Sequence, residues 1–329
     1  MRKKALALIV LFLLLVIFTS CSPHPVQEPA TGGVKREAPL AIEIEKATSL
    51  ERSFQFVVLG DSKILAEQPQ WRGNVILSEL IQRINKDKPA FVVYLGDGPD
   101  QGGPVLEMRA FRNALSLLNC AWYPVIGNHE LSSGAGPDGK KGDGEANFLE
   151  VFGDKLPVQD ARGNKVSYYS FNYQDAHFIV LDTAWQDRSG RSEQGLTTGS
   201  AQWKWLERDL QSARSGNRHI FIFGHEPPLV QIAADKKPNQ KLSDRYITTW
   251  NDIKVVESFI ELCRQYHVEA VISGHFHAYR LFEENDTTHL MSGGAGADLH
   301  VPPEFGGYYH YVRCTVAGDN VSYEVVRLN

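Results

Sequence analysis

The sequence has no arrangement of cysteines that could hold a zinc ion or staple a small domain. Only 4 of its 329 residues are Cys, and no CxxC pair or Cys/His zinc spacing occurs. Cys120, Cys263 and Cys314 lie beside apolar or strand-like sequence, so we expect buried small hydrophobic residues with at most one disulfide. The cysteines therefore predict neither a disulfide framework nor a cysteine-held zinc site.

Clusters of basic residues are also absent after position 4. Lys+Arg 34 against Asp+Glu 39 gives a net charge of −5, and removal of residues 2–4 with a leader would leave 31 against 39, a net charge of −8. Because nucleic-acid backbones are bound by clustered Lys and Arg, no nucleic-acid-binding surface is predicted. The 43% hydrophobic and 22% charged residues are typical of an ordinary globular protein.

The one long apolar run is at the N-terminus. Basic residues 2–4 precede fourteen apolar residues at 5–18, a run shorter than the roughly 20 residues of a membrane-spanning helix. This pattern predicts an export signal. The segment FTSC at 18–21 resembles a bacterial lipoprotein processing site, which implies that Cys21 becomes the lipidated first residue, anchored to a membrane of the cell envelope. Because Phe18 is unusual in such sites, a secreted soluble form is the alternative.

These features divide the chain into three parts. Residues 1–20 are the predicted lipoprotein-type signal peptide. Residues 21–50 contain scattered Pro and a Gly pair with little periodicity, which predicts a flexible tether between membrane and domain. Residues 51–329 form a single predicted domain.

From residue 54 onward, short apolar runs alternate with amphipathic stretches. The runs are rich in Val, Ile and Phe and predict buried strands at residues 54–59, 91–95, 123–126, 177–181, 220–223 and 270–273. Helices are predicted between them at about residues 72–86, 106–118, 199–213 and 252–266. Such alternation predicts an α/β sheet with helices on its faces, in which polar residues at the carboxyl ends of the strands meet at one rim.

The last fifty residues have a different pattern. Strands are predicted at residues 288–291, 308–316 and 321–328, with no helix between them. We therefore expect these strands to form a second, more antiparallel sheet packed on the first. The predicted fold is an α/β protein, a four-layer α/β/β/α sandwich of two packed mixed sheets flanked by helices.

Six polar side chains follow the predicted strands and are ligands that Zn, Mn and Fe accept: Asp61, Asp97, Asn128, His225, His275 and His277. Residues two apart in an extended segment point the same way, so His275 and His277 could each bind one of two ions about 3.5–4 Å apart. A carboxylate between the ions would offer one oxygen to each.

The order of the motifs GD, GD, GNHE, GHxP and GHxH resembles the calcineurin-like metallophosphoesterase superfamily, over residues 54–329. GHFHAYR at 274–280, QWKWLE at 202–207 and GGAGA at 293–297 are similar to its purple acid phosphatase-like branch. The resemblance implies a hydrolase with two divalent or trivalent metal ions of the Mn, Fe or Zn class. Its implied reaction is cleavage of P–O bonds in a small extracytoplasmic phosphate ester by metal-bound hydroxide.

The resemblance also implies a role for each ligand. The implied set is one bridging carboxylate, two side chains on the first ion and three on the second: Asp97; Asp61 and His277; Asn128, His225 and His275. His129 would contact the phosphate and protonate the leaving oxygen, a task that suits imidazole because its ordinary pKa is close to neutral.

The chain departs from the family pattern at Lys63, which replaces the usual His of an Asp-x-His motif. An ammonium group has three donors and no lone pair, so it cannot bind a metal ion. The Tyr that purple acid phosphatases carry three residues after the second Asp is Asp100 here. The first metal site is therefore expected to be weak. Three alternatives follow: a loose two-metal site, a single tight metal with Lys63 compensating charge or gripping a phosphate oxygen, and a catalytically impaired, surface-tethered binding protein.

Two polar segments could select the substrate. Residues 131–147 are either a flap over the metals or a surface excursion. Residues 231–251 carry Arg245 among other cations and aromatics, and they either hold a phosphorylated or aromatic leaving group or form a solvated loop with a packed Trp. The same metal core serves a phosphomonoesterase, a phosphodiesterase or a nucleotide hydrolase, and the sequence predicts no particular oligomer.

Overall fold

The computed structural model describes residues 53–100, 104–131, 144–156, 165–184, 195–231 and 245–328. The predicted signal peptide, Cys21 and the predicted tether lie outside these residues, as do residues 132–143 and 232–244 of the two polar segments. Within the described part of the chain, no helix has both the length and the apolar character needed to cross a membrane.

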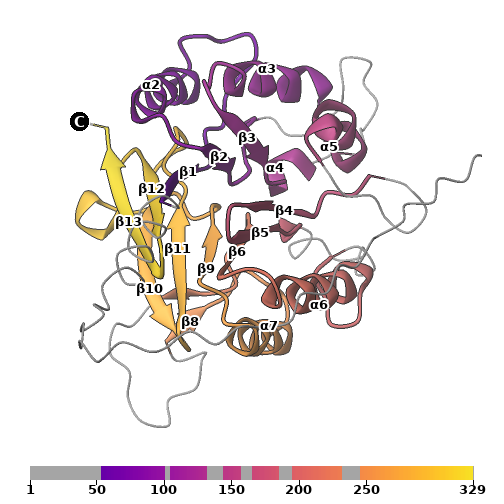
Figure 1. Cartoon of the computed structure of the whole chain (residues 1–329). Coiled ribbons are helices and arrows are strands. Elements are labelled where there is room, and N and C mark those ends of the chain that lie inside the picture. Colours follow the sequence, from indigo (N-terminus) through magenta and orange to yellow (C-terminus); the bar gives the residue numbers. More distant parts are fainter. Residues whose placement is uncertain are drawn as a thin grey trace, which may run out of the picture. The chain divides into compact units, whose positions relative to one another are not determined.

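Two mixed sheets form the centre of the domain (Figure 1). The first sheet has the order β13 (Asn320–Arg327), β12 (His310–Ala317), β1 (Phe54–Leu59), β2 (Phe91–Tyr94), β3 (Ala121–Pro124). The second has the order β10 (Tyr279–Glu284), β11 (Thr287–Ser292), β9 (Ala270–Ser273), β6 (His219–Gly224), β5 (Ala176–Val180), β4 (Tyr169–Tyr173). A small ribbon pairs β7 (Val230–Gln231) with β8 (Tyr246–Ile247).

Helices cover the outer faces of both sheets. The first sheet is covered by α2 (Arg72–Asp87), α3 (Val105–Leu115) and α5 (Gly144–Phe152), and the second by α6 (Ala201–Arg214) and α7 (Ile253–Gln265) (Figure 1). The short helix α4 (Asn128–Leu131) follows β3, and 3-10 turns lie at Gly153–Lys155 and Pro303–Phe305. The predicted four-layer α/β/β/α sandwich is confirmed.

Aromatic side chains fill the space between the sheets. The buried ring of Phe56, on β1, meets Phe178 of β5 edge-on at 5.4 Å between ring centroids and Phe221 of β6 at 5.3 Å. Such large apolar side chains dominate core energetics, and edge-to-face pairs add about 0.5–1.5 kcal/mol beyond their buried area. The two sheets are therefore held firmly where their strands carry polar residues to one rim.

The expected grouping of the last three strands is wrong. β12 pairs antiparallel with β1, with Phe56 opposite Cys314, and β13 continues that first sheet. Only β11 enters the second sheet, parallel to β9. The physical reason is the free edge of β1, whose backbone donors and acceptors need a partner strand on the side away from β2. The hydrophobic pattern of β12 encodes its burial but not its partner.

Other differences from prediction are local. The strand expected at residues 123–126 lies at Ala121–Pro124, and β4, β10 and α5 were not predicted. Cys120, Cys263 and Cys314 are free thiols, and the last two are buried, as expected for small hydrophobic residues.

Candidate metal centre

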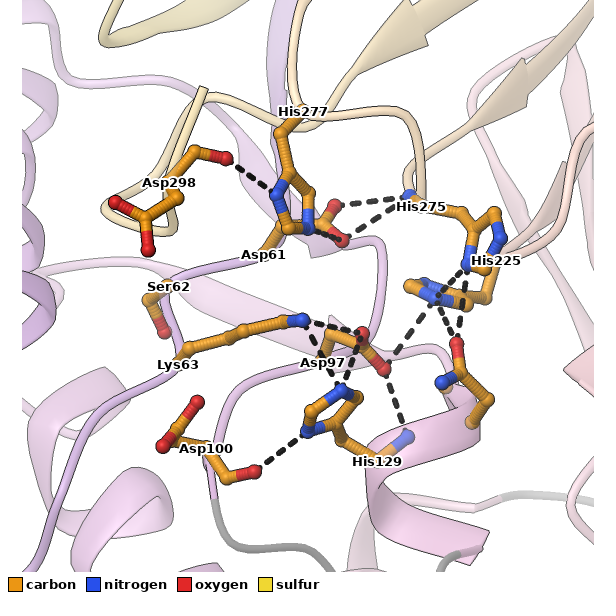
Figure 2. Close-up of polar contacts among 12 residues, drawn as sticks. Asp61, Ser62, Lys63, Asp97, Asp100, His129, His225, His275, His277 and Asp298 are labelled. Carbon is orange, nitrogen blue, oxygen red and sulfur yellow. Dashed lines mark hydrogen bonds and ion pairs between the residues drawn. The ribbon is translucent and has the colours of Figure 1, made fainter. Parts of the chain in front are cut away.

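The six predicted donors come together at the carboxyl ends of the strands (Figure 2). Asp61 follows β1, Asp97 follows β2 and Asn128 begins α4 after β3. His225 follows β6, and His275 and His277 follow β9. Both sheets therefore contribute to one cluster, and ligand atoms of Asp61, Asp97 and His225 lie within 4.8 Å of one another.

One part of this cluster, which we call the imidazole half, consists of the three residues assigned to the second ion: Asn128, His225 and His275. The Asn128 Oδ1 atom lies 3.0 Å from both His225 Nε2 and His275 Nδ1. His225 Nε2 is also 3.3 Å from Oδ1 of Asp97. The other ring nitrogen of His225 donates to the Leu95 carbonyl at 2.7 Å, an outer contact that fixes which nitrogen faces the centre.

The charges around the imidazole half favour a cation there. Although burial opposes the charged form, Asp97 raises the pKa of His225 to about 10. His225 in turn holds the pKa of Asp97 well below its usual range, against the effect of burial. Burial and the charge of His225 lower the pKa of His275 to about 4, which keeps a lone pair on that ring. A metal ion would take the place of the proton on His225.

The other part of the cluster, which we call the lysine half, consists of Lys63 and the two residues assigned to the first ion, Asp61 and His277. Asp61 is fully buried, and its two oxygens accept the His275 backbone N–H at 3.1 and 3.0 Å. His277 Nδ1 donates to the Asp298 carbonyl at 2.6 Å, which directs Nε2 to within 3.4 Å of Asp61 Oδ1. The lysine half therefore offers three possible metal ligands: an oxygen of Asp61, the imidazole of His277 and the Oδ2 atom of Asp97.

Lys63 and His129 also lie in the centre. The Lys63 Nζ atom is 3.0 Å from His129 Nε2 and 3.8 Å from Asp97 Oδ2. The opposite ring nitrogen of His129 is 2.6 Å from the Asp100 carbonyl oxygen. Figure 2 shows the Lys63 side chain reaching inward, between Asp61 and His129. An ammonium group thus lies where the first ion would need a fourth protein ligand.

The backbone at the centre has unusual conformations. Asp61, Asp97 and His275 have positive φ angles of 65°, 55° and 65°, a region that side chains rarely adopt and that is typical of functional sites. Gly127 is required next to them because a Cβ there would come within 2.4 Å of Asp97 Oδ1. Local strain is tolerated here to direct both carboxylates inward.

Glu130 orders the loops that carry these ligands and was not among the predicted site residues. Its buried carboxylate accepts the backbone N–H groups of Asp97 at 3.0 Å, Gly98 at 2.8 Å and Gly127 at 2.8 Å. Burial, followed by the charge of Asp97, raises the pKa of Glu130 to about 7. Its place in the GNHE segment was the available signal.

The donor set fits a metal ion better in the imidazole half than in the lysine half. Asn128, His225, His275 and Asp97 Oδ1 are neighbouring groups, and the positive charge among them is a proton on His225 that a metal ion would replace. The lysine half offers Asp61, His277 and Asp97 Oδ2, and Lys63 adds a positive charge that repels a metal ion. The weakness of the first metal site stays a prediction, and the 3.8 Å contact of Lys63 with Asp97 Oδ2 is the geometry that bears on it.

Arg245 lies apart from the cluster. Its guanidinium makes two bonds of 2.6 and 2.8 Å to the buried carboxylate of Glu284, which also accepts from the Tyr246 hydroxyl at 2.7 Å. Glu284 ends β10, the strand that leads away from the GHFH segment. The structure thus gives Arg245 a buried ion pair and does not bring it to the metal ligands as a substrate-binding residue.

Known proteins resemble this chain in sequence and in fold. The calcineurin-like phosphoesterase family model matches residues 54–279. Probable purple acid phosphatase 20 of Arabidopsis thaliana is 25% identical over 163 residues, which cover 49% of this chain and 32% of that protein. The chain spans 32% of the length of the curated relatives it matches.

Two solved structures share the fold. A purple acid phosphatase from yellow lupin seeds has a TM-score of 0.60 at 17% identity, covering 84% of this chain and 53% of that one. A dimetal phosphatase from Danio rerio has a TM-score of 0.58 at 16% identity, covering 83% of this chain and 95% of that one. With the family model matching more than half of its length, and with the predicted motifs at one rim of this fold, the chain belongs to the calcineurin-like phosphoesterase family.

Proposed function

We propose that the protein is a metal-dependent hydrolase that cleaves a P–O bond of a small phosphate ester. The observation that carries this proposal is the convergence of Asp61, Asp97 and four Asn or His donors from both sheets on one point (Figure 2). Bound in the imidazole half by Asn128, His225 and His275, and in the lysine half by Asp61 and His277, divalent metal ions would polarise the phosphoryl group and activate water for attack.

The protein's own groups would position the ester. Asp97 directs one oxygen to each half, and the backbone N–H of His129 donates to Oδ1 at 2.9 Å, which fixes the orientation of the carboxylate. Lys63 and His129 have side-chain exposures of 21% and 27%, whereas Asp61, Asp97, His225 and His277 are buried. An ester entering from solvent can therefore reach Lys63 and His129. The positive charge and N–H donors of Lys63 suit a phosphoryl group.

Hydrolysis of chromogenic esters tests this proposal. We expect the metal-stripped protein to be inactive and Mn²⁺ or Zn²⁺ to restore the hydrolysis of p-nitrophenyl phosphate. Comparison with bis(p-nitrophenyl) phosphate separates a monoesterase from a diesterase or nucleotide hydrolase. A chain that releases no nitrophenol with any of these metals would instead be a binding protein, and hydrolysis that a chelator leaves unchanged would contradict the metal dependence.

We further propose that the chain is exported and anchored through lipidated Cys21, so that its substrate is extracytoplasmic. The support is the order of basic residues 2–4, apolar residues 5–18 and the cysteine that follows. Metabolic labelling with a fatty acid should mark the wild-type protein and not Cys21→Ala. Labelling of neither protein, with both recovered from the culture medium, would favour the secreted form.

A further inference from the structure

The contact between Lys63 and His129 fixes which atoms carry hydrogen. A carbonyl oxygen only accepts hydrogen bonds, so the 2.6 Å contact with the Asp100 carbonyl requires a hydrogen on His129 Nδ1. An ammonium group only donates, so the 3.0 Å contact with Lys63 Nζ requires a lone pair on His129 Nε2. His129 is therefore a neutral imidazole with its hydrogen on Nδ1. The nitrogen that would protonate a leaving oxygen is already accepting a hydrogen bond.

The backbone at Lys63 is held in place by several contacts. Its φ angle is 49°, in the left-handed region, and its N–H donates to the Asp97 carbonyl at 3.1 Å. The Trp71 indole donates to the Lys63 carbonyl at 2.9 Å. At Gly73, in the first turn of α2, a Cβ would come within 2.7 Å of the same carbonyl oxygen. These contacts are made by the Lys63 backbone, and they fix the point from which its side chain extends.

The Lys63 ammonium can bind a further acceptor besides the groups that it already contacts. Lys63 Nζ is 3.8 Å from Asp97 Oδ2, and the Asp61 carboxylate belongs to the same half of the centre (Figure 2). His129 accepts a hydrogen bond from one of the three N–H groups of Lys63, which leaves donors for another acceptor. With 21% of the side chain exposed, that acceptor can arrive from solvent. A tetrahedral oxyanion supplies lone pairs for these remaining N–H groups, in charge-assisted hydrogen bonds.

We propose that Lys63 and His129 form an anion-binding pair, in which the Lys63 ammonium contacts a phosphoryl oxygen and His129 positions it by accepting its hydrogen bond. The inference rests on the proposed function and refines its substrate class. A fixed cation interacts more strongly with the dianionic phosphoryl group of a monoester than with the monoanion of a diester. The favoured substrate is a phosphomonoester, and the family's proton-donor role does not carry over to His129.

Phosphate binding by the metal-loaded protein tests the pair without requiring turnover. We expect Lys63→Met, at saturating Mn²⁺ and with metal content verified by elemental analysis, to bind inorganic phosphate at least about 10-fold more weakly in calorimetry. Lys63→Arg should retain affinity within about 3-fold because it keeps the charge. Lys204→Met, at an exposed position of α6, is the matched control and should bind as the wild type does. Equal phosphate affinity in wild type and Lys63→Met would overturn the inference.

Nitrogen NMR of the His129 ring gives a second readout, which a purely structural lysine would not move. We expect a protonated Nδ1 and an unprotonated, hydrogen-bonded Nε2 in the wild type, and a shift of the Nε2 signal in Lys63→Met. A protonated Nε2 in the wild type would refute the assigned pair. If phosphate binding depends on Lys63 but neither ester is hydrolysed, the proposed function fails while this inference stands.

Discussion

The imidazole half and the lysine half share Asp97 but differ in what faces its two oxygens. Oδ1 meets His225 Nε2 at 3.3 Å, in a group of four donors that leave one place for a cation. Oδ2 meets the Lys63 ammonium at 3.8 Å, so part of the positive charge on that side is already supplied by the protein. The Asp97 carboxylate thus lies between a group of imidazole and amide ligands on one side and the Lys63 ammonium on the other.

If the centre binds two metal ions as proposed, Lys63 would alter one site without removing its other ligands. Asp61 and His277 keep orientations suited to ligation, since each is tied down by the backbone of the GHFH segment or of Asp298. What changes is the balance of charge. We expect a half that must accept an ion beside an ammonium group to bind it less tightly than a half of two imidazoles and an amide oxygen, in which the ion would replace the proton on His225.

The largest expected effect comes from Asp97, which both halves need. Asp97→Asn should lower the turnover of p-nitrophenyl phosphate at least about 1000-fold, because metal polarisation contributes several kcal/mol and each 1.36 kcal/mol is a factor of ten. Asp298→Asn is the control, since that side chain is 86% exposed and only its backbone carbonyl serves the site. More than a tenth of wild-type turnover in Asp97→Asn would break the shared-carboxylate account.

A smaller pair of effects compares the halves directly. His225→Ala should lower turnover at least about 100-fold and abolish retention of the tightly held ion after dialysis, because removing a ligand costs at least as much as removing its outer partner. His277→Ala should cost only about 10-fold and leave the tight ion in place. Elemental analysis and initial rates measure both variants. If His277→Ala lost more metal and more activity than His225→Ala, the expected difference between the two halves would be contradicted.

The smallest expected effect on turnover comes from breaking the ion pair between Arg245 and Glu284, which lies outside both halves. Glu284→Gln should lower the free energy of unfolding by about 3–5 kcal/mol, because it leaves the buried guanidinium without its counter-charge. The Michaelis constant of the folded protein should not change. Urea denaturation and steady-state kinetics check the two parts. A raised Michaelis constant with unchanged stability would return Arg245 to the substrate site.

The sequence predicted the parts of this site that depend on local patterns. Strands that end in GD, GNHE, GHEP or GHFH place their next polar residue at the rim, so the six donors could be found from residue type and position alone. The rest depends on contacts between distant segments. The direction of the Lys63 side chain follows from its left-handed backbone and from the contact of its carbonyl with Trp71, the residue before helix α2. Likewise, β12 joins β1 because of a free edge that its own sequence does not reveal.

Direct titration of the metal-stripped protein with Mn²⁺ tests the central claim, that the lysine half binds its ion more weakly because of Lys63. Calorimetry should show one tight site and a second at least about 10-fold weaker in the wild type, and Lys63→His should bring the second within a few-fold of the first. Two equally tight sites in the wild type, or a second site that Lys63→His leaves unchanged, would contradict the account.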